Sequence, residues 1–270
     1  MSVARGRTVD PTVYPEEERV GEDMLQRWIM ELLRPLLQWW LTHRGVKAFV
    51  GADQFIYWRQ YDAHARIAPD IYVLPGVDPC TRVRTWKLWQ DRVVPSFALE
   101  VVSQDWEKDY IEVPARYDEL GVRELLVFDP DFDEHHDGVR WQVFRQVSKR
   151  GLVRVEASHA DRVRSQVLGC WFRAVGEGRE TRIRIAVGTR GDELVPTPEE
   201  AERSAKEAAL ARVRELEAEL LRVTRRTHEP PALPSASQRK ISHLRNGVRW
   251  RALASARDLG PRGLFRGECI

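Results

Sequence analysis

Two acidic residues stand inside apolar runs that are typical of buried β-strands. Asp70 follows Pro69 at the head of "PDIYVL", and Glu100 interrupts the apolar run "FALEVV". Such a run indicates a strand covered on both faces. A carboxylate at that position costs several kcal/mol unless something pairs with it. We therefore ask whether these two acids meet at one point of a sheet.

The chemistry of such a meeting is that of a metal site. Two adjoining carboxylates repel each other and raise each other's pKa, and a divalent cation removes the repulsion. Mg²⁺ takes oxygen ligands at about 2.0–2.1 Å and keeps several waters. A site of this kind can hold phosphate and generate a hydroxide nucleophile. Glu22, at the start of the first predicted helix, is a third candidate acid.

A purely structural role is the alternative. Asp70 could be only a turn or capping residue, and Glu100 could pair with one of the many arginines. Because both acids are embedded in apolar strands, we favour the shared site over this alternative.

The elements that must position the acids follow from hydrophobic periodicity. Residues 21–40 repeat apolar side chains at helical spacing, with Pro35 expected to kink or break the helix. We expect residues 75–91 to form a loop, and residues 181–187 to form an amphipathic edge strand. Short apolar runs predict strands over residues 46–50, 54–58, 69–74, 97–102 and 124–130.

A strand–helix–strand unit surrounds Glu100. The helix covers about residues 109–120 and ends at Gly121, a typical C-terminal cap. This order predicts a crossover between parallel strands. Two period-two runs, residues 139–147 and 151–157, predict an antiparallel hairpin. The fold class is therefore α/β or α+β, with a mixed central sheet and helices against it, and we favour α/β.

A charged helix is predicted after this core. Thr197 and Glu200 form a possible capping box, and a partial heptad seam with charges between predicts a helix that self-associates, so we expect a homodimer. Beyond a Pro/Ser-rich break, the basic tail is expected to be disordered. We predict a core over residues 1–196, a charged amphipathic helix over 197–227 and a tail over 228–270. The seam residues are Leu210, Val213, Leu216, Leu220 and Val223.

Composition sets few limits on partners. The net charge of the 270-residue chain is only +2, which argues neither for nor against nucleic acid. No apolar stretch reaches the roughly 18 residues of a membrane span, and the N-terminus lacks the apolar core of a signal peptide. We therefore expect a cytoplasmic protein without a membrane partner.

The motifs resemble a known family. "PDIYVL", then "PSFALEVVS", then "YDELGVRELLVFDP" look like the Uma (Uma-two) family of proposed endonucleases, which belongs to the restriction-endonuclease-like PD-(D/E)XK superfamily. The resemblance implies a three-layer α/β core, an acid-bound Mg²⁺ or Mn²⁺, and hydrolysis of DNA phosphodiesters without an organic cofactor. It makes Asp70 and Glu100 metal ligands and Glu22 the acid of the first helix. Gln26 stands where many relatives have His or Gln.

One departure concerns the superfamily's lysine. Its usual position, two residues after the Glu, is Val102, and the helix position that relatives use instead is Val113. Lys108 could supply the missing cation, although it is equally plausible as a solvated surface residue. Arg116 could stabilise phosphate charge but cannot act as a base. Loss of such a contact can cost about 10²–10³ in rate.

Three hypotheses follow. The first is a metal-dependent endonuclease, with Asp70, Glu100, Lys108 and Glu22 as catalytic residues. The second is a catalytically inactive module of the same fold that binds nucleic acid or oligomerises. The third is a partner protein that acts through its coiled coil, in which the carboxylates are incidental.

Overall fold

The computed structural model describes residues 10, 12–14, 24–102, 106–132 and 138–228, and in its helices leaves the side chains of 106–109, 111 and 225–228 undescribed. The chain divides into two compact units, Met1–Glu202 and Arg203–Ile270. The three-part division expected from sequence stays a prediction. Within the described ranges, no helix combines the length and apolarity that a membrane crossing needs.

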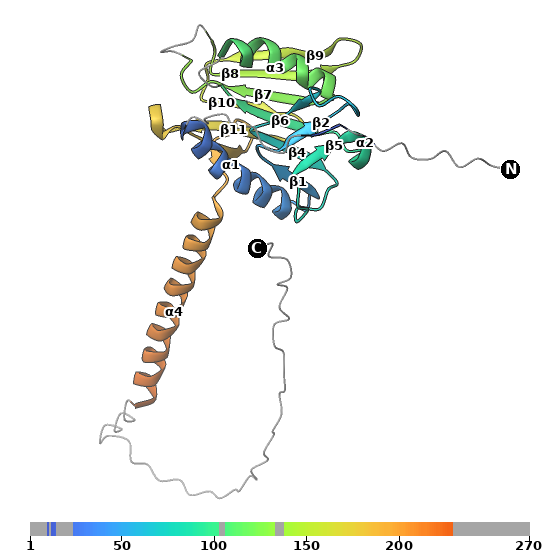
Figure 1. Cartoon of the computed structure of the whole chain (residues 1–270). Coiled ribbons are helices and arrows are strands. Elements are labelled where there is room, and N and C mark those ends of the chain that lie inside the picture. Colours follow the sequence, from blue (N-terminus) through green and yellow to red (C-terminus); the bar gives the residue numbers. More distant parts are fainter. Residues whose placement is uncertain (1–9, 11, 15–23, 103–105, 133–137, 229–270) are drawn as a thin grey trace, which may run out of the picture. The chain divides into compact units, whose positions relative to one another are not determined.

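A six-stranded sheet forms the centre of the first unit (Figure 1). β6 and β7 are parallel, and the helix α3 (Trp106–Leu120) connects them, so the predicted crossover is confirmed. All other neighbours in this sheet are antiparallel, including the predicted hairpin β8–β9. The strand order is β1 (Ala48–Gly51), β4 (Ile71–Pro75), β6 (Phe97–Val101), β7 (Glu124–Phe128), β8 (Trp141–Val147) and β9 (Gly151–Ser158).

Two apolar clusters cover the two faces of this sheet. α3 lies over one face, where Ala98 and Val127 pack with Tyr117. On the other face, Leu99 and Leu126 pack with the buried stripe of α1 (Met24–His43) and with a second sheet. The central sheet with helices against it confirms the predicted α/β class.

The second sheet is antiparallel and corrects one expectation. Its order is β10 (Arg162–Ser165), β11 (Cys170–Val175), β12 (Arg182–Val187) and β13 (Glu193–Leu194). The strand predicted at the edge is β12, which is flanked on both sides. The prediction was wrong because a two-residue strand such as β13 leaves no periodic signal in the sequence.

A third, three-stranded sheet corrects the predicted loop. β5 (Thr85–Lys87) pairs in parallel with β2 (Phe55–Tyr57), which also pairs with β3 (Arg66–Ile67), and the short helix α2 (Leu88–Asp91) follows. Only Trp86 of β5 is buried, so the strand carries one apolar anchor and no alternation.

The first helix is more continuous than expected and ends three residues later. Pro35 lies inside α1 and does not end it. Leu33, Leu36 and Leu37, on both sides of the proline, are fully buried in one cluster. Packing of this stripe against the sheets offsets the local cost of the proline.

The charged helix α4 extends over Pro198–His228. The predicted capping box is present: Glu200 accepts from the Thr197 N–H at 2.8 Å, and its own N–H lies 3.2 Å from the Thr197 hydroxyl oxygen. A 3₁₀ turn, η1 (Gly178–Glu180), precedes β12.

Candidate active site

Asp70, which directly precedes β4, lies opposite Glu100 of the adjacent strand β6. β4 and β6 pair antiparallel with Ile71 opposite Leu99. Continuing this register by one residue sets Asp70 opposite Glu100. Glu100 faces α3, where Tyr117 bonds it, and Asp70 accepts from the Val101 N–H of β6. The structure thus brings together the two carboxylates that the sequence singled out.

Asp70 is held from two directions. It is only 7% exposed. The Gln26 side-chain amide, from α1, donates to its Oδ1 at 2.7 Å, and the backbone N–H of Val101 donates to its Oδ2 at 2.7 Å. Both donors fix the orientation of the carboxylate, and Gln26 ties the start of α1 to the site.

Glu100 is held by α3. The strand around it is buried, but Glu100 itself is partly exposed. Tyr117, fully buried on α3, donates its hydroxyl hydrogen to Glu100 Oε1. Burial raises the pKa of Tyr117 well above its ordinary value, and the negative charges of Glu100 and Asp70 raise it further. The phenol therefore stays protonated and remains a donor.

A second tyrosine repeats this arrangement two helical turns earlier. Tyr110 donates its hydroxyl hydrogen to Asp129, which directly follows β7 and is fully buried. The Asp131 N–H donates to the same carboxylate at 2.9 Å. Tyr110 and Tyr117 are seven residues apart, so they lie on one face of α3 and anchor it to acids of two parallel strands.

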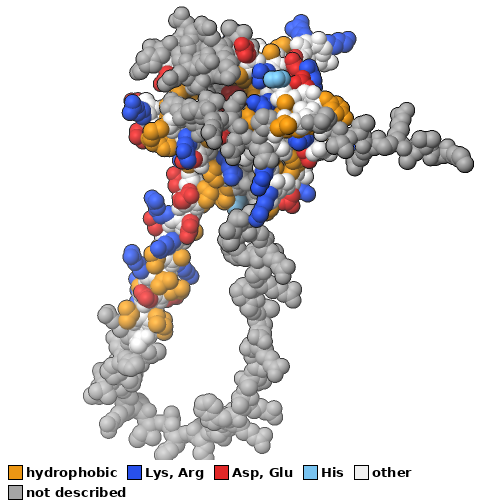
Figure 2. Space-filling view, in the orientation of Figure 1, with side chains coloured by type: hydrophobic (Ala, Val, Ile, Leu, Met, Phe, Trp, Pro, Cys, Tyr) orange, Lys and Arg blue, Asp and Glu red, His pale blue; other side chains and the backbone are white. Residues whose placement is uncertain are grey.

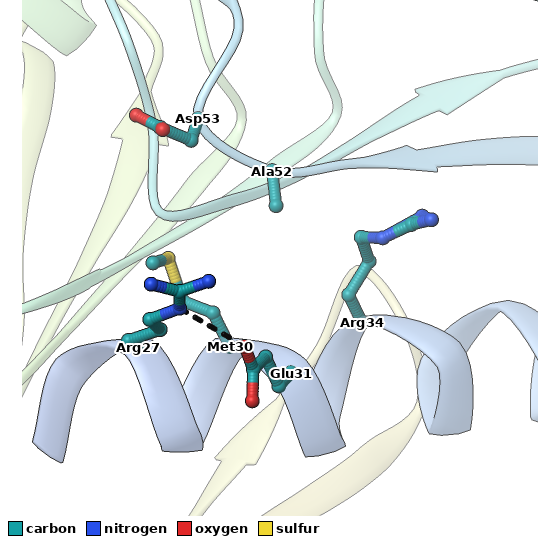
Figure 3. A pocket seen from close by; sticks show the side chains of 6 residues that line it. All are labelled: Arg27, Met30, Glu31, Arg34, Ala52 and Asp53. Atoms are coloured by element: carbon teal, nitrogen blue, oxygen red, sulfur yellow. Dashed lines mark hydrogen bonds and ion pairs between the residues drawn. The ribbon is translucent and has the colours of Figure 1, made fainter. Parts of the chain in front are cut away.

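A depression between α1 and the β1–β2 connection is lined by charges of both signs (Figure 3). Arg27, Glu31 and Arg34 of α1 line it on one side, and Asp53 of the β1–β2 connection lines it on the other. Arg27 Nε pairs with Glu31 Oε1 at 3.0 Å. The depression adjoins the site, because Gln26 precedes Arg27 and the Asp53 N–H donates to the carbonyl oxygen of Pro69 at 2.8 Å.

A protein-family model matches the part of the chain that contains these residues. The model of the Uma2 family, described as "Putative restriction endonuclease", matches residues 20–175, which is more than half of the chain. This chain belongs to the Uma2 family. The resemblance read from the sequence motifs is thereby confirmed.

One solved structure similar to this Uma2 chain is a crystal structure described as a "putative nuclease belonging to DUF820" from Anabaena variabilis. The TM-score is 0.38 at 12% sequence identity, and the match covers 55% of this chain and 75% of the other. No curated protein matches the chain.

The two positions at which the resemblance expects a lysine are part of the core of this Uma2 chain. Val102 is 5% exposed and Val113 is 8% exposed, and both belong to the cluster beneath α3. Arg116 has a structural contact: its guanidinium donates to the carbonyl oxygen of Arg66 in β3 at 3.1 Å.

Two predicted site residues are only partly placed or not placed. Lys108 lies in the first turn of α3, but its side chain is not among those described. Glu22 lies outside the described residues. Their roles stay predictions.

The donor set is suited to Mg²⁺ or Mn²⁺. In the part of the chain that the structure describes, no three or more His, Cys, Asp or Glu residues gather to hold a metal. Asp70 and Glu100 are two carboxylates, one residue short of such a group. Mg²⁺ commonly binds through one or two carboxylates, water and substrate phosphate.

Sequence reasoning did not identify Tyr117 as the partner of Glu100. The available signal was its position: Val113, Tyr117 and Leu120 recur at helical spacing on the buried stripe of α3. A tyrosine on such a stripe brings its hydroxyl into the core and needs an acceptor there. Which acceptor it finds depends on the tertiary fold.

Proposed function

We propose that this Uma2 chain is a metal-dependent endonuclease that hydrolyses DNA phosphodiester bonds. The observation that carries the proposal is the placement of Asp70 opposite Glu100, each with its own buried donor. Two acids held beside each other against their mutual repulsion are characteristic of a cation site. Membership in a family described as restriction endonucleases supports the same reading.

In this proposal Asp70 and Glu100 hold Mg²⁺ or Mn²⁺, and Glu22 is an additional ligand. When bound, the ion supplies Lewis acidity toward a phosphate oxygen and lowers the pKa of water. Gln26 and the Val101 N–H hold Asp70 in place, and Tyr117 holds Glu100. These donors are structural supports that keep the carboxylates oriented.

The cationic contribution comes from residues around the acids. Lys108, at the start of α3, is proposed to stabilise charge on the phosphate in place of the missing lysine. Arg27 and Arg34 flank the adjoining depression and are exposed, so they can contact further phosphates of the DNA backbone. A homodimer would present two such sites to a duplex.

The test combines metal binding with cleavage. Thermal unfolding is measured with and without Mn²⁺ for wild type and for Glu100→Gln, alongside nicking of supercoiled plasmid. Glu112→Gln is the matched control, because Glu112 is an exposed acid on α3. We expect Mn²⁺ to raise the melting temperature of wild type and Glu112→Gln only, and both to nick plasmid. If Mn²⁺ stabilises none of the three proteins, the shared metal site is wrong.

The second candidate function is a metal-binding but non-cleaving module that binds nucleic acid. The buried Val102 and Val113 favour it, because neither position can offer a cation to the phosphate. Stabilisation by Mn²⁺ without any nicking, together with retention of DNA in a salt-dependent binding assay, would select this candidate over the enzyme.

A further inference from the structure

The helix α4 carries an apolar surface that its own residues do not cover. It is 31 residues long, and its described large apolar side chains beyond the first turns are between 47% and 68% exposed. Figure 2 shows these side chains along the helix among acidic and basic ones. An exposed apolar surface of this kind indicates an interaction site. The side chains are Leu210, Val213, Leu216, Leu220, Leu221 and Val223.

The spacing of four of these residues is that of a coiled coil. In a heptad written abcdefg, Val213 and Leu220 take the a positions, and Leu216 and Val223 take the d positions. This set, here called the α4 seam, follows the 3-4 spacing of knobs-into-holes packing. Val213 at a with Leu216 at d is the pattern that favours two strands, whereas the next heptad, Leu220 at a with Val223 at d, has the reverse pattern.

The charges beside the seam select an orientation. With this register Arg212 is at g and Glu217 is at the e position of the next heptad. In a parallel pair the g residue of one helix faces that e residue of the other, so opposite charges meet on both sides of the seam. An antiparallel pair brings g against g and e against e, which separates Arg212 from Glu217.

We infer that two copies of the chain associate through a parallel, in-register coiled coil of α4, with the α4 seam at its centre. The seam covers only about two heptads, so the association is concentration-dependent. In the single chain Arg212 pairs with Glu215 of the same helix at 2.5 Å. In the inferred dimer Arg212 would pair with Glu217 of the second copy instead. This inference does not rest on the proposed nuclease activity.

The first test measures association of the full chain. Sedimentation equilibrium over a range of protein concentrations gives the dimer dissociation constant for wild type, Leu220→Asp and Leu221→Asp. Leu220 is in the seam and Leu221 is at position b, yet the two are similarly exposed at 68% and 61%. We expect Leu220→Asp to weaken the dimer at least tenfold and Leu221→Asp to leave it unchanged. A wild type that stays monomeric, or equal effects of both variants, would overturn the inference.

The second test reports orientation. A d residue faces its own counterpart in a parallel, in-register pair, so Leu216→Cys should form an intermolecular disulfide under mild oxidation. Leu221→Cys is the control, and wild type measures the background of the native cysteines. If the dimer depends on Leu220 but Leu216→Cys cross-links no more than Leu221→Cys, the parallel register is wrong.

Discussion

Tyr117 on α3 donates a hydrogen bond to Glu100 on β6, so a fully buried phenol supports a partly exposed carboxylate. The support comes from the face of the sheet that α3 covers. On the other strand of the pair, a backbone N–H and the Gln26 amide support Asp70. Each acid of the proposed site thus has supports of its own, and these can be removed one at a time.

Removal of the Tyr117 hydroxyl should weaken metal binding. Tyr117→Phe leaves the ring in place but takes away a hydrogen bond to a charged group, which costs about 1.5–3 kcal/mol of unfolding free energy. Loss of a partner that orients a metal ligand commonly costs about 10–100-fold in metal affinity. The Mn²⁺ concentration that half-saturates the thermal stabilisation measures this effect.

Tyr110→Phe is the matched control for that experiment. It removes the same atom from the same face of α3, but the hydroxyl serves Asp129. We expect Tyr110→Phe to lose about as much unfolding free energy as Tyr117→Phe. Its Mn²⁺ affinity should equal that of wild type. Equal Mn²⁺ affinity in Tyr117→Phe and wild type would show that Tyr117 does not position a metal ligand.

Tyr117 also makes stability depend on alkaline pH. Its pKa is raised in the folded protein, first by burial and then by Glu100, whereas the unfolded phenol titrates near about 10. Below pH about 10 both states are protonated and the contribution of Tyr117 is fully present. As the pH rises above about 10, only the unfolded phenol ionises, so stability falls.

The measurement is urea unfolding between pH 8 and pH 10.5. Wild type should lose stability faster than Tyr117→Phe as the pH rises, so the difference between them should shrink at the alkaline end. Tyr72 has a pKa that burial also raises, but it is present in both proteins and cancels in the comparison. A constant difference across this range would contradict the prediction.

Sequence patterns predicted the two strands next to the acids because each run is made almost entirely of apolar residues. The Asp70–Glu100 pairing could be anticipated for that reason. The patterns did not predict β5 or the inner position of β12, since short strands and strand neighbours are set by tertiary pairing. The Tyr117–Glu100 hydrogen bond was missed for the same reason. It joins α3 to β6, and only the tertiary fold brings these two elements together.

Glu124 should be a stability residue with no role in metal binding. It is fully buried and accepts from Arg145 Nε at 2.8 Å, from the Gln166 N–H at 2.9 Å and from the Ser165 hydroxyl. It thereby joins β7 of the main sheet to the turn after β10. Glu124→Ala leaves a largely buried cation without its partner, which costs about 3–5 kcal/mol.

Urea unfolding checks this value against an exposed ion pair. Glu119 pairs with Arg59 at 2.8 Å, but both side chains are more than half exposed, so Glu119→Ala should cost less than about 1 kcal/mol. The rise in melting temperature caused by Mn²⁺ should persist in both variants. Similar losses of unfolding free energy in the two variants would show that Glu124 does not stabilise the contact between β7 and the turn after β10.

Glu100→Gln should make the metal-free protein more stable. The substitution keeps an oxygen that can accept from Tyr117 and removes a negative charge beside Asp70. The two carboxylates repel each other unless a cation lies between them, so relief of that repulsion should add about 1 kcal/mol to the unfolding free energy. Thermal and urea unfolding in EDTA, compared with wild type and the exposed control Glu112→Gln, measure the change.

A functional site commonly has this trade-off, in which residues kept for activity reduce the stability of the fold. A marked loss of stability in Glu100→Gln would instead identify Glu100 as a structural acid, whose charge the fold needs even without metal.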